Sequence, residues 1–217
     1  MGVGVFGKLP DQRDYVQHGM DPNLMAMVDP WIQQCLQNSQ AQLGDAWLDL
    51  YLCAPIWRFW LGASVVGRTT LGAVMPSVDG VGRYFPLFMT WSGENRLDAP
   101  EINPQDTWFD AVEQALLSAL AEDGTYPALL EHASTLPEPE VSSGPNDRSD
   151  HNSALADLRL AHQRDFYDPL SFWWVPASPD GGIPAQAHMW RGLPSALEYA
   201  MLLTAGRTEE PNLASGG

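Results

Sequence analysis

Positive charge is scarce in this chain. Its 217 residues include 11 Lys and Arg against 27 Asp and Glu, which gives a formal net charge of -16. Such a surface repels nucleic-acid phosphates and anionic lipid headgroups, so we expect no nucleic-acid partner. The excess of acid suits either a solubility role or a partner with a basic patch.

Cysteine and long apolar runs are also lacking. With only Cys35 and Cys53, a disulfide framework is excluded and a reducing compartment is favoured. No apolar stretch has the length needed to span a bilayer, and the N-terminus lacks the basic segment and apolar run of a secretory signal. Together these absences predict a cytoplasmic protein that does not insert into membranes.

The spacings typical of metal and phosphate sites are missing as well. One close group of ligand residues, Asp147, Asp150 and His151, lies in a polar loop, where a solvated run is the simpler interpretation. The segment Gly2-Val-Gly-Val-Phe-Gly-Lys8 resembles the start of a phosphate-binding loop, but Leu9 stands where Ser or Thr is required. We therefore predict no metal site and no cofactor site.

Apolar residues, in contrast, are plentiful. They make up 45% of the chain and include 9 Trp, which is enough for a large core. Alternating or continuous apolar runs predict strands at residues 3–9, 56–61, 65–75, 84–91, 171–175 and 187–190. The nearly continuous run at 84–91 is typical of a strand that is covered on both faces.

Helical periodicity appears between these strands. A helix is predicted to begin at Asp21-Pro22, because Asp is a good N-cap and Pro is tolerated in the first turn. Its apolar stripe extends to Gly44, although Pro30 predicts a kink or break near Asp29. Further helices are predicted at residues 106–124, 155–163 and 194–206.

Strands that alternate with helices predict an α/β fold. We expect a single domain over residues 1–207, with a central mixed β-sheet flanked by helices in a three-layer sandwich. Sequence rich in Pro, Ser and acid predicts a mobile acidic loop near residues 135–153. Residues 208–217 are expected to form a frayed tail.

The most informative segment is Met75-Pro-Ser-Val-Asp-Gly-Val-Gly-Arg-Tyr-Phe-Pro86. It places Ser77, Asp79 and Arg83 among turn-forming residues, directly before an apolar strand. Ser77 lacks the flanking glycines of a nucleophile elbow and has no evident histidine partner. Ser and Asp can instead accept hydrogen bonds from turn amides, and we expect Arg83 to pair with Asp79 or Asp14. A structural turn is the favoured interpretation, and a catalytic site is kept as the alternative.

Several segments together resemble the TagF/ImpM family of type VI secretion accessory proteins. In chain order these are Phe6-Gly-Lys-Leu-Pro10 with Asp14-Tyr-Val16, Tyr51-Leu-Cys-Ala-Pro-Ile-Trp-Arg-Phe59, Met75-Pro-Ser-Val-Asp79 with Val81-Gly-Arg-Tyr-Phe-Pro-Leu87, Ser171 with Trp173-Trp174, and Gly192-Leu-Pro194. The chain departs from the usual pattern at Arg13-Asp14-Tyr15, where Gly-Asp-Phe is usual, and at Gly80, where Arg is common.

The resemblance implies a bacterial, cytoplasmic, non-enzymatic protein that represses type VI secretion after translation. Its implied partner is the forkhead-associated scaffold protein of the apparatus. It also implies a set of motif residues that either brace the fold or form an interface: Lys8, Asp14, Trp57, Arg58, Ser77, Asp79 and Arg83.

The alternative is a small hydrolase or ligand-binding enzyme that uses Ser77, Asp79 and Arg83. Geometry separates the two interpretations. Side chains that point inward and satisfy backbone groups argue against catalysis, whereas an open pocket with a histidine in hydrogen-bond reach would support it.

Overall fold

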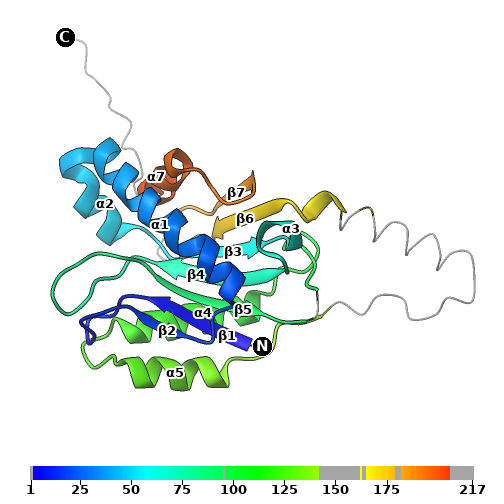
Figure 1. Ribbon diagram of the computed structural model, residues 1–217, viewed down its shortest axis with the longest axis horizontal. Helices are drawn as coiled ribbons and strands as arrows, with labels where there is room; N and C mark the ends of the chain where they lie inside the picture. Colours follow the sequence, from blue (N-terminus) through cyan, green and yellow to red (C-terminus); the bar gives the residue numbers. More distant parts are fainter. Residues whose placement is uncertain (1, 95, 142–161, 163–164, 179–181, 206–217) are drawn as a thin grey trace, which may run out of the picture.

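A seven-stranded sheet forms the middle layer of the protein (Figure 1). The computed structural model describes residues 2–94, 96–141, 162, 165–178 and 182–205. The strands follow the order β2-β1-β5-β4-β3-β6-β7. Their bounds are β1 (Gly2–Gly7), β2 (Val16–His18), β3 (Trp57–Leu61), β4 (Thr70–Met75), β5 (Leu87–Ser92), β6 (Leu170–Val175) and β7 (Gln186–Arg191). The predicted α/β sandwich is confirmed, but each neighbouring pair is antiparallel, so the sheet is not mixed as predicted.

Helices cover both faces of this sheet. One face carries α1 (Pro22–Leu43), α2 (Trp47–Cys53) and α7 (Ala196–Thr204), and the opposite face carries α4 (Asp106–Ala119) and α5 (Tyr126–Thr135) (Figure 1). Two short elements, η1 (Gly44–Ala46) and α3 (Ala63–Val66), join the larger ones. The result is a helix–sheet–helix arrangement with two hydrophobic cores.

The central strands β3, β4 and β5 are buried on both faces, which explains their continuous apolar sequences. Successive side chains point to opposite sides of a strand. Phe59 and Phe88 therefore join the core under α1 and α7, while Trp60 and Met89 join the core under α4. The three strands are neighbours, as the sequence predicts.

Helix α1 begins and ends as predicted, but it does not break at Pro30. The Asp21 carboxylate accepts hydrogen bonds from the amides of Asn23 and Leu24, and Gly44 ends the helix with a φ of 53°. The helix nevertheless runs without interruption from Pro22 to Leu43. Pro30 lies on the exposed side, so packing of the buried face outweighs one missing hydrogen bond. Of the predicted kink or break near Asp29, the break is wrong.

Other elements differ from the predictions in extent. The predicted strand at 65–75 contains the end of α3 before β4 begins, and the one at 84–91 begins only at Leu87. The sequence predictions miss α2 and α5. Several predicted features lie outside the described residues. They are the helix at 155–163 except His162, the group Asp147, Asp150 and His151, the end of the last helix at residue 206, the loop from residue 142 onward, and the tail. None of the helices that the structure describes is long and apolar enough to cross a membrane.

The junction after β1 depends on glycine. Gly7 has a φ of 143°, and a Cβ added there would overlap the carbonyl oxygen of Pro86. We expect Gly7→Ala to lower the free energy of unfolding by about 3 kcal/mol, because strain and overlap add. Gly67→Ala is the matched control: its φ of 86° and ψ of -16° are left-handed helical, and the added Cβ would meet only Asn23 Nδ2, at an ordinary 3.8 Å, so about 1 kcal/mol is expected. Urea denaturation measures both, and equal losses would contradict the account.

Candidate functional site

The segment between β4 and β5 folds into a tight hairpin that ends in the Asp79 turn, which we define as residues 77–85. Val78 and Tyr84 form an isolated antiparallel bridge. The amide of Asp79 donates to the carbonyl of Arg83 at 3.1 Å, and the amide of Gly82 donates to the carbonyl of Asp79 at 3.0 Å. Gly82 adopts a φ of 88°, which glycine tolerates without strain. The sequence therefore forms this turn from local hydrogen bonds.

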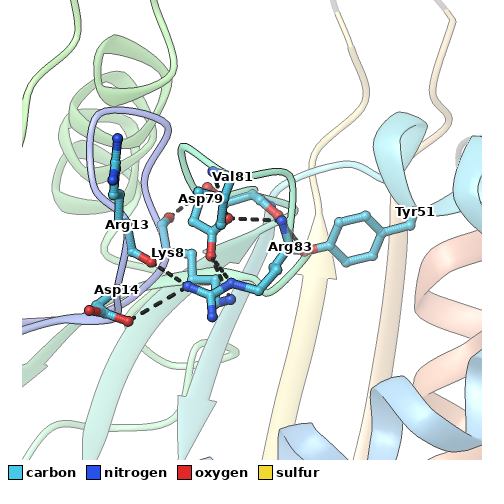
Figure 2. Close-up of polar contacts among 8 residues, drawn as sticks. Lys8, Arg13, Asp14, Tyr51, Asp79, Val81 and Arg83 are labelled. Atoms are coloured by element: carbon cyan, nitrogen blue, oxygen red, sulfur yellow. Dashed lines mark hydrogen bonds and ion pairs between the residues drawn. The ribbon is translucent and has the colours of Figure 1, made fainter.

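The carboxylate of Asp79 is the centre of the turn (Figure 2). Its Oδ1 accepts from the amides of Val81 at 3.1 Å and Arg83 at 2.9 Å. Its Oδ2 accepts from Lys8 Nζ at 2.8 Å and Arg83 Nε at 2.7 Å. The side chain is 0% exposed. Each oxygen thus has two donors, and two cations compensate one buried negative charge.

These donors set the protonation of Asp79. Burial acts to raise the pKa of the Asp79 carboxyl, but hydrogen bonds from Lys8, Arg83 and the Val81 amide outweigh it. The pKa therefore lies well below its ordinary value of 3.8. The carboxylate is ionised at neutral pH and serves as an acceptor.

Lys8 and Ser77 connect the Asp79 turn to the rest of the fold. Lys8 follows β1, and its ammonium lies 4.9 Å from the ring centroid of Tyr15. The Ser77 hydroxyl donates to the Lys8 carbonyl at 2.6 Å. On the other side, the Tyr51 hydroxyl of α2 accepts from the Ser77 amide and donates to the Ser77 carbonyl, each at 3.0 Å. The turn is therefore fastened to both β1 and α2.

Arg83 forms the outer rim of the cluster. Its guanidinium lies between the carboxylates of Asp79 and Asp14, and it also donates to the carbonyl of Arg13 (Figure 2). The contact of Arg83 Nη2 with Asp14 Oδ1 is long, at 3.6 Å, and the Asp14 side chain is 93% exposed. The predicted pairing of Arg83 with a carboxylate is found with Asp79, while Asp14 adds a solvated contact.

This arrangement does not resemble a hydrolytic site. Ser77 is buried, and its hydroxyl hydrogen is directed at a backbone carbonyl rather than at a base. In the part of the chain that the structure describes, no histidine is hydrogen-bonded to Ser77. Nor do three or more His, Cys, Asp or Glu side chains gather there in a way that could hold a metal ion. The polar groups instead satisfy backbone atoms and one another.

Trp57 and Arg58 lie away from the Asp79 turn, in β3. Because they are adjacent, their side chains point to opposite faces of the sheet. Trp57 Nε1 donates to the carbonyl of Leu202 in α7 at 3.0 Å. Five of the predicted residues, Lys8, Asp14, Ser77, Asp79 and Arg83, thus come together, and two do not.

Arg58 has its own cluster under α4. Its Nε donates to Glu113 at 2.6 Å and its Nη2 to Asp110 at 2.7 Å, while Nη1 lies 3.5 Å from Asp106. Burial acts to lower the pKa of Arg58, but the bonds to Glu113 and Asp110 outweigh it and raise the pKa. Sequence reasoning missed these acids, although their spacing of four and three residues places them on one face of a helix. It also left Tyr51 out of the site, although a segment that carries the family resemblance begins at this residue.

Removal of Lys8 should destabilise the protein. Lys8→Met leaves the Asp79 carboxylate buried with one cation instead of two, and we expect the free energy of unfolding to fall by about 3 kcal/mol. Asp14→Asn is the control, because it alters an exposed contact and should cost less than about 0.5 kcal/mol. Chemical denaturation at pH 7 measures both. A Lys8→Met protein as stable as the wild type would show that the buried pair does not brace the fold.

The low pKa of Asp79 predicts an acid-dependent contribution to stability. A group with a depressed folded-state pKa stabilises the fold above its unfolded pKa, and this stabilisation is lost as pH falls toward the folded value. The stability difference between wild type and Asp79→Asn should therefore be largest above about pH 5 and shrink below about pH 4. Thermal unfolding at pH 7, 5 and 3.5 measures it. Ser77→Ala is the control, since its loss involves no titrating group and should not follow this trend.

Comparisons with known proteins place the chain in a family. Residues 4–136 match the TagF N-terminal domain, described as type VI secretion system-associated. Among solved structures, the crystal structure of PA0076 from Pseudomonas aeruginosa PAO1 is similar, with 33% sequence identity over 99% of both chains and a TM-score of 0.78. No functionally curated protein matches. The matched residues include most of β1, the Asp79 turn and β3 to β5, and the chain therefore belongs to the TagF family of type VI secretion system-associated proteins.

Proposed function

We propose that this chain is a non-enzymatic repressor of type VI secretion, which acts after translation by binding a cytoplasmic scaffold component of the apparatus. The observation that carries the proposal is membership of the TagF family. The likeness to PA0076 over 99% of both chains supports the same assignment for the whole described fold. By resemblance, the partner is the forkhead-associated scaffold protein.

The geometry of the Asp79 turn supports a binding role over an enzymatic one. Catalytic groups need access to substrate and free hydrogen-bonding capacity. Ser77 and Asp79 are both buried, and their polar atoms bind backbone groups, Lys8 or Arg83. In this proposal the family motif fixes the shape of the protein, and a different surface makes the regulatory contact.

A secretion assay tests this function. Deletion of the gene should raise the release of type VI secreted substrates into the medium while transcripts of the apparatus genes stay constant, and a plasmid copy should restore repression. The purified chain should also capture the purified forkhead-associated scaffold protein of the same bacterium. Unchanged secretion together with failure to capture the scaffold would overturn the proposal.

A further inference from the structure

An apolar groove lies where the sheet extends beyond α4. Its volume is about 590 Å³. The floor comes from side chains that face each other across two strands: Phe172 opposite Met189, and Trp174 opposite Ala187. Pro100 and Pro104, in the segment before α4, also line the groove. A groove of this size and lining can hold a few side chains of another molecule.

The strand that borders the groove has an open edge. β7 ends the sheet and pairs only with β6 among the described strands (Figure 1). It spans six residues, contains no proline, and exposes 51% of Met189. The strand at the other edge, β2, has only three residues. An open edge strand of this length can accept a further strand through its backbone groups.

The surroundings of the groove carry excess negative charge. Arg58 pairs with Trp174 in the register of β3 and β6, so its acid partners lie one strand from the groove floor. Three carboxylates from α4 face this one guanidinium, and those of Asp106 and Asp110 are largely exposed. Glu101 lines the groove itself.

Charge selects among possible occupants. Arg191 is the last residue of β7 and pairs with Leu170, at the opposite end of the strand from the pair Trp174 and Ala187. A second copy of this chain would bring two acidic surfaces and two net charges of -16 together, which like-charge repulsion opposes. A basic, extended segment has the complementary charge. The long aliphatic stems of its Arg or Lys side chains can cover the apolar floor of the groove, while their charged ends reach the carboxylates of α4.

We propose that the groove and the edge of β7 form the docking site for an extended, arginine- or lysine-rich segment of a protein partner, which adds to the sheet as an eighth strand. An added strand would lie about 4.8 Å beyond β7 and direct alternate side chains over the groove. This inference rests on the proposed function for the statement that the partner is a protein.

Binding of a designed peptide to the purified full chain tests the site. The probe is acetyl-Thr-Arg-Val-Arg-Val-Arg-Thr-amide, and its control has Glu in place of each Arg. Calorimetry should detect binding of the basic peptide that weakens as salt rises from about 0.05 to 0.3 M, and no binding of the acidic one. Met189→Lys should weaken binding by roughly tenfold or more. Leu52→Lys adds the same charge at a similarly exposed site (54%) on α2, which covers the opposite face of the sheet, and should retain most of the affinity.

Backbone pairing is tested separately with two N-methylated versions of the basic peptide, one methylated at the Arg residues and one at the Val residues. Only one set of amides can face β7 in an added strand. We therefore expect one version to lose binding and the other to keep it.

Several results would overturn the inference. They are equal binding of the acidic peptide, no binding of the basic one, equal losses in Met189→Lys and Leu52→Lys, and two N-methylated peptides that both bind normally. A dimer that Met189→Lys dissociates in sedimentation velocity would also overturn it, by assigning the face to a second copy. These measurements use no secretion component, so the inference can fail while the secretion assay still supports the proposed function.

Discussion

The buried carboxylate of Asp79 is the interaction on which the architecture around the family motif depends. A charge removed from water is costly unless cations and hydrogen-bond donors surround it. Here the donors are Lys8, the residue directly after β1, and, from the turn itself, Arg83 and two amides. The cluster therefore positions the end of β1 against the start of β5, where Gly7 already requires close contact with Pro86.

Local features of this region could be predicted from the sequence, and distant ones could not. Asp79, Gly82 and Arg83 lie within one turn, so residue preferences indicate both the turn and its ion pair. Lys8 is 71 residues from Asp79, and no local pattern records that contact. The antiparallel pairing of the strands is also a matter of chain connectivity, which alternation of strands and helices does not determine.

The helices show the same division. Asp21 and Gly44 mark the ends of α1 because capping is local. Pro30 predicts a break that does not form, because the burial of the opposite helix face is a tertiary effect that a local pattern does not record. The short helix α2 is missed although its buried residues, Trp47, Leu50 and Tyr51, follow helical spacing. Seven residues give too few turns for such a pattern to stand out.

The unequal edges of the sheet bear on how the protein could control a larger assembly. A sheet with one edge strand of six residues and one of three offers one edge long enough to receive an added strand. Binding at that edge would occupy it, in a one-to-one ratio. The number of copies in the cell, and not a rate of turnover, would then set how much of a partner is held back.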